Sequence, residues 1–219
     1  MYIPTINFQL LLESIPFVLS GLPFTLGIAC FAFIMGNIVG IGLMVLGFFA
    51  PKWGRSLIRL YLSFFRGVPG LVLLFLLYFA LPYRLSALQA SCICFTLTSS
   101  AFIGEIYRGS VQGVSHGQWD AASALGLSRK TILLKIILPQ AFRISVPALG
   151  NVAMDLLKST SLAAMITVPE IFQKAKIVGG REFDYLTMYI LVALIYWGLC
   201  VGIGQIQAVI EKKLQPFAS

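Results

Sequence analysis

Five long runs of apolar residues divide the chain, and short polar segments separate them. A helix needs about 20 consecutive apolar residues to cross the hydrocarbon core of a bilayer. The runs are Leu22–Phe49, Leu57–Leu81, Leu85–Ile106, Ile144–Ile166 and Tyr185–Ile210. The pattern therefore predicts an all-α polytopic membrane protein with about five transmembrane helices.

Small residues and one break mark the first two runs. The second run contains Gly67-Val68-Pro69-Gly70, which predicts an interruption of its helix. The first run is rich in glycine, and small residues let helices approach one another closely in lipid. These glycines are Gly36, Gly40, Gly42 and Gly47.

The segment that precedes these runs, Met1–Ser20, is apolar but holds Glu13, Pro4 and Pro16. We predict a helix that lies in the membrane interface, with a sixth span as the alternative. No Lys or Arg precedes Lys52, so the segment lacks the basic start of a secretory signal peptide.

The composition agrees with a membrane protein. Hydrophobic residues make up 58% of the chain and charged residues 11%, with a mean hydropathy of +0.91. A soluble domain carries about 25% charged residues. The net charge of +8 does not favour a nucleic-acid partner, because cations beside membrane spans usually reflect topology.

The positive charges also predict the orientation of the chain. Loops that stay in the cytoplasm carry an excess of Lys and Arg. With five spans, one side of the membrane holds Lys52, Arg55, Arg59, Arg108, Arg129, Lys130, Lys135, Arg143, Lys212 and Lys213. The other side holds Arg84, Lys174, Lys176 and Arg181. The N-terminus is therefore predicted outside the cell and the C-terminus in the cytoplasm.

The polar segment 112–143, between the third and fourth runs, carries the most informative motif. Its residues Asp120–Pro139 read DAASALGLSRKTILLKIILP and combine two amphipathic pieces with a cluster of cations. This pattern fits a docking surface better than a simple connection between helices. An amphipathic hairpin that lies on lipid is the alternative.

Local signals divide this motif into two helices. A first helix is expected over Gln118–Leu125, and Gly126 can end it in the left-handed conformation. Ser128 is then a plausible N-cap for the second helix, and Pro139 marks a break. On the first helix, one face would carry Trp119, Ala122, Leu125 and Ala121.

The spacing of this motif resembles the cytoplasmic "EAA" loop of ATP-binding-cassette (ABC) importer permeases. Asp120-Ala121-Ala122 is followed after three residues by Gly126, and after nine more by Ile136-x-Leu138-Pro139. Asp120 stands where that family usually has Glu, so the acidic character remains on a shorter side chain.

Other segments resemble the polar amino-acid branch of that family, the histidine, glutamine, arginine and cystine type. Phe65-Arg66-Gly67-Val68-Pro69 is similar to its "FRGTP" element, with Val68 in place of Thr. Leu138-Pro139-Gln140-Ala141 and Lys158-Ser159-Thr160-Ser161-Leu162 are similar to further elements of this branch.

The resemblance implies a function and a set of partners. The chain would be a single permease domain over 1–219, with the type I ABC importer permease fold and cytoplasmic coupling helices. It would form a homo- or heterodimer with a second permease protomer, bind two copies of an ATPase subunit inside the cell, and receive a polar amino acid from an extracytoplasmic binding protein. ATP and Mg would bind the ATPase, with no cofactor on this chain. The docking residues implied for segment 112–143 are Trp119, Asp120, Ala121, Ala122, Gly126, Ile136, Leu138 and Pro139.

Charged residues inside predicted spans are costly and usually face a bundle interior or a wet cavity. Asp155 and Lys158, three residues apart, share a helix face and could hold the ammonium and carboxylate of an amino acid. Asn151 lies one turn away, and Ser99 and Ser100 could add hydrogen bonds. A self-neutralising ion pair and ordinary helix–helix hydrogen bonds remain the alternatives.

Three other charged residues are predicted to be structural. Glu105 and Arg108 are also three apart, near the cytoplasmic edge of a span, where Arg108 can reach the interface. Arg66 precedes the Gly-x-Pro-Gly break and is expected to hold the cytoplasmic end of the second span. The lone His116 has no nearby Cys, so no metal site is predicted.

Two other function classes compete with a permease. A membrane-embedded enzyme would need a nucleophile with a partner base, and the chain has neither a Gly-x-Ser-x-Gly element nor a phosphate-binding G-x-x-x-x-G-K-[ST] loop. A channel or structural membrane subunit would give no reason for the Asp120–Pro139 spacing. Co-purification of an ATPase would separate these classes from an importer.

Overall fold

The computed structural model describes residues 5–214, and within that range all regular secondary structure is helical. The all-α prediction is confirmed. The elements are α1 (Phe8–Leu19), α2 (Leu22–Phe49), α3 (Lys52–Gly67), α4 (Gly70–Phe75), η1 (Leu76–Ala80), α5 (Ala87–Gln112), α6 (His116–Ala124), α7 (Arg129–Ile132), η2 (Leu133–Ile137), α8 (Leu138–Ser159), η3 (Thr160–Ile166), α9 (Ile171–Glu182) and α10 (Tyr185–Leu214).

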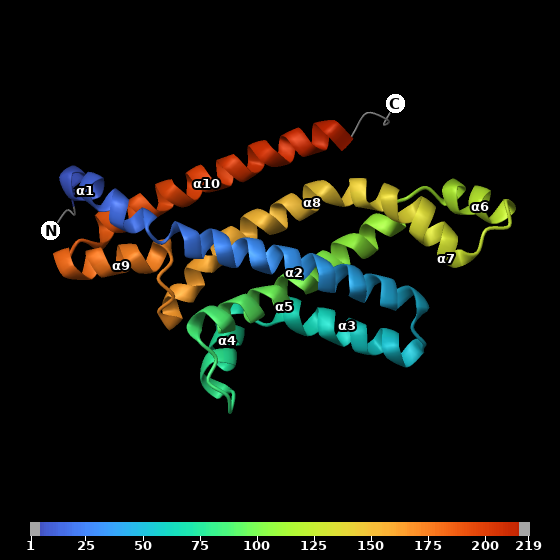
Figure 1. Cartoon of the computed structure of the whole chain (residues 1–219), viewed down its shortest axis with the longest axis horizontal. Coiled ribbons are helices and arrows are strands. Elements are labelled where there is room, and N and C mark those ends of the chain that lie inside the picture. The colour runs from blue at the N-terminus through green and yellow to red at the C-terminus, as the bar shows by residue number, and fades with distance from the viewer. Residues whose placement is uncertain (1–4, 215–219) are drawn as a thin grey trace.

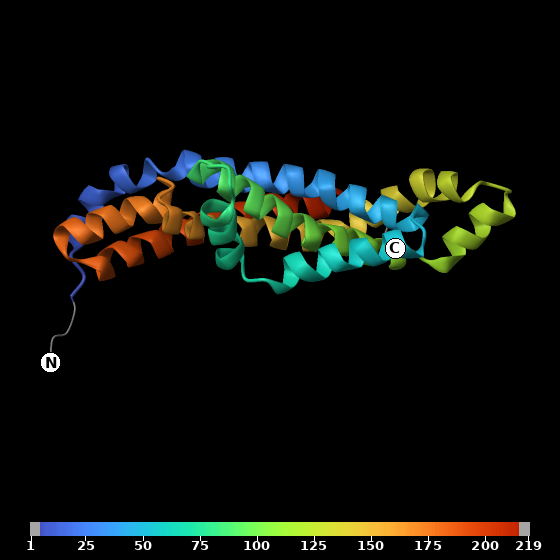
Figure 2. The ribbon, with the colours of Figure 1, turned by 90° about the horizontal axis from the view of Figure 1, so that it is seen from below.

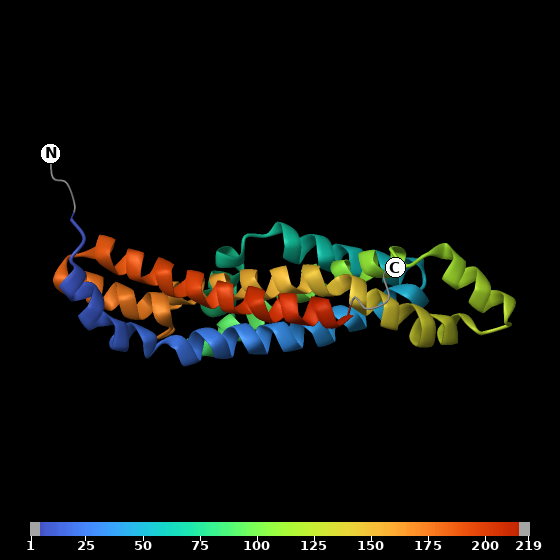
Figure 3. The same ribbon diagram turned by 90° about the horizontal axis from the view of Figure 1, so that it is seen from above.

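The long helices α2, α5, α8 and α10 run side by side along the length of an elongated bundle (Figures 1 and 2). The α6–α7 hairpin extends from one end, and α1 and α9 pack at the opposite end (Figure 3). Helix α3 lies against α5 and starts at the end that carries the hairpin (Figure 1). The two ends of the bundle are therefore structurally different.

Four helical stretches are long and apolar enough to cross a membrane: Leu22–Phe49, Ala87–Gln112, Arg129–Ile166 and Tyr185–Leu214. A fifth span exists only as the pair Lys52–Gly67 and Gly70–Ala80, bent by 102°. The second run is thus a broken element rather than a continuous span. Val68 is extended before Pro69, as the residue before a proline prefers, so the helix stops there.

The fourth span starts much earlier than predicted, because helical structure continues from Arg129 through Pro139 to Ile166. The predicted break at Pro139 is wrong. A wider π-helical turn at Leu133–Ile137 precedes α8, and Pro139 lies in the first turn of α8. A π turn shifts the backbone hydrogen bonds that a proline would otherwise disrupt.

The N-terminal helix α1 has 12 residues and is about 18 Å long, too short to cross a bilayer by itself. It packs against α9 and α10 with Val18 fully buried. The alternative of a sixth span is therefore wrong, and an interfacial position remains a prediction. The first four residues of the predicted segment Met1–Ser20 lie outside the described residues.

Glycine brings α2 and α5 into close contact. A Cβ atom on Gly40 would lie 2.9 Å from the backbone nitrogen of Gly104, and one on Gly36 would meet the Ser99 hydroxyl. Gly42, in contrast, faces open space. The predicted role of glycine in close packing is confirmed for Gly36 and Gly40 but not for Gly42.

Candidate functional site

The hairpin of α6 and α7 is closed by a tight, locally encoded turn. Gly126 has a φ of +70°, the left-handed conformation predicted from the sequence. The amide of Leu127 donates to the carbonyl of Ala122 at 3.3 Å, and the amide of Gly126 donates to Ser123 at 3.0 Å. This hydrogen-bond pair is the Schellman arrangement that ends many helices.

The second helix of the hairpin starts as expected. The Ser128 hydroxyl accepts a hydrogen bond from the Thr131 amide at 3.2 Å, which confirms Ser128 as the N-cap. Ile132 and Leu133 are buried against the end of α5, and Gln140 of α8 donates to Gln118 of α6 at 3.3 Å. The hairpin is therefore anchored to the bundle.

The hairpin presents a different face from the one predicted. Ala122 is 3% exposed and packs inward beside Trp119, whereas Leu125 is 78% exposed. The chain turns at Leu125, the C-cap residue that follows α6, and its side chain is exposed. Asp120, Ala121 and Gly126 are exposed, so they belong to the surface that a partner could reach.

The other predicted docking residues lie where α7 continues into α8. Ile136 and Leu138 are partly buried against the hydrophobic cluster at this end of the bundle, and Pro139 is exposed. The eight predicted residues thus divide into an exposed set and a set that holds the hairpin in place.

A cavity of about 410 Å³ lies between α3, α5, the start of α4 and α8. Arg66 of α3 and Asp155 of α8 both line it, together with Thr98 and Ser99 of α5. The remaining walls are mainly aromatic and aliphatic, including Phe65 and Phe102. The cavity therefore combines one cation, one anion and hydroxyl groups in an apolar setting.

A second cavity, of about 630 Å³, lies between α8 and α10. Asn151, Asp155 and Lys158 line it, so the structure brings these three predicted residues together. Asp155 lines both cavities. Lys158 Nζ lies 2.7 Å from the carboxylate of Asp155, and their side chains are 58% and 72% exposed. An ion pair this exposed contributes little to packing.

The two predicted serines have different surroundings. The Ser99 hydroxyl donates to the carbonyl of Ala32 at 3.1 Å, and Ser100 lies 2.7 Å from the Tyr61 hydroxyl. Both side chains are buried, and of the two only Ser99 lines the cavity beside Arg66. For Ser100 the hydrogen bond between α3 and α5 is the better interpretation.

Glu105 and Arg108 form the ion pair expected from their spacing. Arg108 donates to Glu105 from two nitrogens and to Gln112 at 3.0 Å. Arg66 lies in the last turn of α3, 14 residues beyond Lys52 and so about 21 Å along the helix from the hairpin end of the bundle. The structure thus places Arg66 away from the hairpin and next to the bend of the second run, and its position relative to the cytoplasm stays a prediction.

Sequence reasoning missed a buried carboxylate, Glu170, which is 0% exposed. It is the N-cap of α9 and accepts hydrogen bonds from the amides of Phe172 and Gln173 at 2.9 and 2.7 Å, and from the Tyr196 hydroxyl at 2.9 Å. Thr25 of α2 bonds the adjacent Ile171 amide at 3.3 Å. The position of Glu170 directly before a helical segment, where a carboxylate can act as N-cap, was the available signal.

Burial raises the pKa of Glu170 above the usual carboxyl range, because the charged form loses hydration. Its hydrogen bonds and the nearby Lys176 act in the opposite direction but do not cancel this effect. Glu170 lies between the last two spans and caps α9, the helix that packs at the end of the bundle opposite the hairpin (Figure 1). The residue therefore joins α2, α9 and α10 at one point.

Metal or disulfide chemistry has no group of residues to support it in the described part of the chain. Among residues 5–214, no three His, Cys, Asp or Glu side chains lie together as metal ligands would. Cys30, Cys92, Cys94 and Cys200 are free thiols.

These features define a class, an all-α multi-pass membrane protein with polar cavities in its bundle and an anchored helical hairpin at one end. The model of the family described as binding-protein-dependent transport system inner membrane component matches residues 38–216. The chain belongs to this family.

Individual relatives agree with this family. The chain is 49% identical over 210 residues to "Probable amino-acid ABC transporter permease protein YckA" of Bacillus subtilis (strain 168), covering 94% of this chain and 93% of that protein. It is 35% identical over 208 residues to "L-cystine transport system permease protein TcyB" of the same organism, covering 93% and 89%. The "Crystal structure of an amino acid ABC transporter with histidines" is similar with a TM-score of 0.90 and 28% identity, covering 95% of this chain and 99% of that one.

The chain is therefore the permease subunit of an ABC importer in the inner membrane, with the importer permease fold. It is not itself an enzyme, because ATP hydrolysis belongs to a separate subunit. Importers of this family work with an ATPase and a binding protein. The alternatives of a membrane-embedded enzyme and of a channel or structural subunit do not apply.

Proposed function

We propose that this permease carries a polar amino acid and binds it in the cavity between α3, α5 and α8. The observation that carries the proposal is that Arg66 and Asp155 line one cavity of about 410 Å³. A zwitterionic amino acid needs a cation for its carboxylate and an anion for its ammonium group. Arg66 supplies the first, as a fork that matches a carboxylate, and Asp155 supplies the second.

The size and position of the cavity support this proposal. Ligand cavities typically measure about 300–1,000 Å³ and are mostly apolar with a few convergent polar groups. The cavity lies beside the bend between α3 and α4, because Val68, Pro69 and Gly70 line it. Asp155 also lines the cavity that holds Lys158 and Asn151. The ammonium group of the substrate could therefore replace Lys158 as the ion-pair partner of Asp155.

In the proposed transport cycle, the hairpin of α6 and α7 couples the permease to its ATPase. The exposed residues Asp120, Ala121 and Gly126 form the docking surface for an ATPase subunit in the cytoplasm. Two ATPase subunits, which bind ATP and Mg, serve a dimer of permease protomers. When ATP closes the ATPase pair, the docked hairpins move and the bundle reopens outward. A binding protein delivers the amino acid at the end that carries α1 and α9.

Uptake into proteoliposomes that contain the whole complex tests the proposal. We expect ATP-dependent uptake of one or a few polar amino acids from a labelled panel. Asp155→Asn and Arg66→Gln should each reduce uptake roughly 10- to 100-fold, because a hydrogen bond to a charged group contributes about 1.5–3 kcal/mol. Glu182→Gln, at an exposed carboxylate on α9, is the matched control.

Assembly distinguishes this site from a packing role. If Asp155 only neutralises Lys158, Asp155→Asn should lower the yield of assembled complex and leave selectivity unchanged. Normal assembly with normal uptake and selectivity in both variants would remove the two residues from the substrate site.

A further inference from the structure

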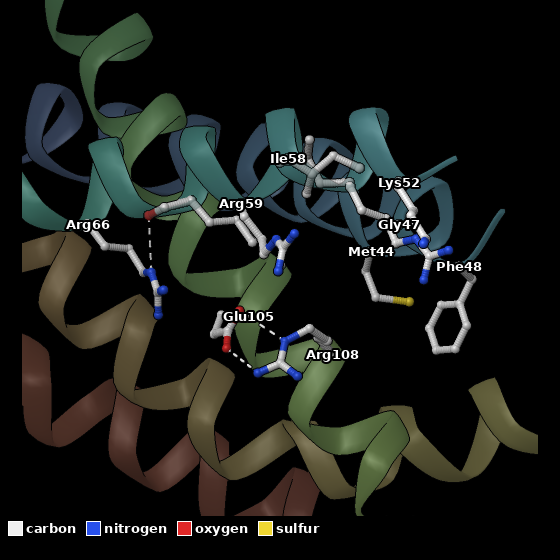
Figure 4. A pocket seen from close by; sticks show the side chains of 13 residues that line it. Met44, Gly47, Phe48, Lys52, Ile58, Arg59, Arg66, Glu105 and Arg108 are labelled. Atoms are coloured by element: carbon white, nitrogen blue, oxygen red, sulfur yellow. Dashed lines mark hydrogen bonds and ion pairs between the residues drawn. The ribbon is translucent and has the colours of Figure 1, made fainter. Parts of the chain in front are cut away.

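A third cavity, of about 690 Å³, lies between α2, α3 and α5 and shares Arg66 with the proposed substrate cavity (Figure 4). Arg59 and Arg66 extend into it from α3, and the paired Glu105 and Arg108 face them from α5 (Figure 4). Lys52 lies near its other end, beside Phe48 (Figure 4). The cavity follows α3 along most of its length.

The charge of this cavity is strongly one-sided. Its lining has five cations, Lys52, Arg55, Arg59, Arg66 and Arg108, and one carboxylate, Glu105. That carboxylate pairs with Arg108. The four cations of α3 have no carboxylate within ion-pair distance in the described part of the chain. A row of cations this close together favours an anionic ligand.

The rest of the lining is apolar. Leu43, Met44 and Phe48 of α2 and Ile58 and Leu62 of α3 form the walls. On another side of α3 an apolar stripe recurs every three or four residues and is 48–71% exposed. Its members are Trp53, Leu57, Leu60 and Phe64. Helix α3 therefore presents a cationic face to the cavity and an apolar face away from it.

We propose that this cavity binds an anionic phospholipid, with the phosphate group held by Arg55 and Arg59 and an acyl chain against the apolar walls. Arginine binds phosphate oxygens through its planar fork, and basic pockets between membrane helices hold anionic headgroups. Inorganic phosphate shares the anionic group but would leave the apolar walls without a ligand. The site lies in the cytoplasmic leaflet if the chain has the orientation predicted from its cations, and it does not depend on the identity of the transported amino acid.

Lipid retention by the purified complex tests this site. The complex with its ATPase is extracted in mild detergent, washed, and analysed by native mass spectrometry for bound phosphatidylglycerol and phosphatidylcholine. We expect the wild type to keep phosphatidylglycerol. The double change R55Q/R59Q should weaken its binding roughly 25-fold, because each cation beside an anionic headgroup contributes about fivefold.

Two further variants separate charge from other effects. K212Q/K213Q removes two exposed cations at the end of α10, outside the cavity, and should keep the lipid as the wild type does. R55K/R59K preserves the charge and should retain more lipid than R55Q/R59Q. Excess inorganic phosphate should not displace the lipid.

Specific outcomes would overturn the proposal. These are equal retention of phosphatidylcholine, unchanged phosphatidylglycerol in R55Q/R59Q, equal loss in K212Q/K213Q, or displacement by inorganic phosphate. R55Q/R59Q could instead dissociate the permease protomers while each protomer still retains the lipid. In that case the lipid is bound elsewhere, and the second protomer covers this cavity.

Discussion

Glu170 is the residue whose chemistry depends most on its surroundings. Its carboxylate is fully buried, yet it accepts three hydrogen bonds, from two amides of α9 and from Tyr196 of α10. A Cβ atom on Gly21 would lie 2.5 Å from the backbone of Glu170, so the start of α2 packs directly against this point. One side chain thus connects the elements at the end opposite the hairpin.

The raised pKa of Glu170 predicts a pH dependence of stability. Between the usual carboxyl pKa and the raised one, the folded state binds more protons than the unfolded state. The free energy of unfolding should therefore fall as pH rises through this window. Glu170→Gln should flatten the profile, and it should lower stability by about 1–3 kcal/mol because an amide cannot satisfy all the donors.

Thermal unfolding of the detergent-solubilised complex between pH 5 and pH 8 measures this effect. Glu13→Gln, at an exposed carboxylate of α1, is the control. Parallel pH profiles for the wild type and Glu170→Gln would contradict the assignment.

At the scale of elements, glycines do two different things in this chain. At Gly40 the close contact of α2 with α5 leaves no room for a side chain. Gly126, in contrast, permits the left-handed backbone conformation that ends α6. The first requirement is set by a neighbouring helix and the second by the local turn. Each requirement can be tested by substituting the glycine and comparing the result with the same substitution at a glycine that has no such requirement.

Packing of α2 on α5 is tested by Gly40→Ala. The new Cβ would lie 2.9 Å from the Gly104 nitrogen, so the helices must separate, at a cost of about 1–3 kcal/mol. Gly42→Ala is the matched control, because nothing lies within 4 Å of its Cβ position. It should be neutral or stabilise the helix by up to about 1 kcal/mol. Equal melting temperatures for the two variants would show that the contact has no role.

The docking role of the hairpin is tested by Gly126→Val. A β-branched residue in the left-handed conformation costs about 1–3 kcal/mol, so the turn should rearrange while the chain still inserts. We expect loss of ATPase co-purification and of substrate-stimulated ATP hydrolysis. Gly202→Val, in open space on α10, is the control. Normal coupling in Gly126→Val would place the docking surface elsewhere.

At the scale of the whole molecule, the two ends of the bundle differ in structure and in charge. The hairpin end carries α6, α7 and the start of α3, with cations that include Arg55, Arg129 and Lys130. The opposite end carries α1 and α9, with the surface ion pair of Arg181 and Glu182. This asymmetry supports the orientation predicted from the positive charges.

Labelling with a membrane-impermeant thiol reagent tests that orientation. The four native cysteines are first replaced by serine or alanine. A cysteine at Arg181, on the exposed end of α9, should react in intact cells, and one at Lys130 only after permeabilisation. The reverse pattern would contradict both the orientation and the assignment of the ATPase-docking end.

The sequence by itself determined the features that depend on local composition. The lengths of the apolar runs predicted the helical spans, because crossing a bilayer requires about 20 apolar residues in succession. The left-handed Gly126 and the cap at Ser128 were predictable because a turn is governed by the residues that form it. The spacing of Asp120–Pro139 led to the family, which was then confirmed.

Only the tertiary structure decided which side chains share a site. Arg66 and Asp155 are 89 residues apart, and the packing of both α3 and α8 on α5 places them beside one cavity. Ala122 is buried because α6 packs against α7 and η2 in the hydrophobic cluster at this end, whereas Leu125 is exposed, and the periodicity of α6 alone does not record these contacts. Glu170 is buried by α2, α9 and α10 together. Burial and charge proximity arise from contacts between distant segments, so the sequence pattern of one element does not contain them.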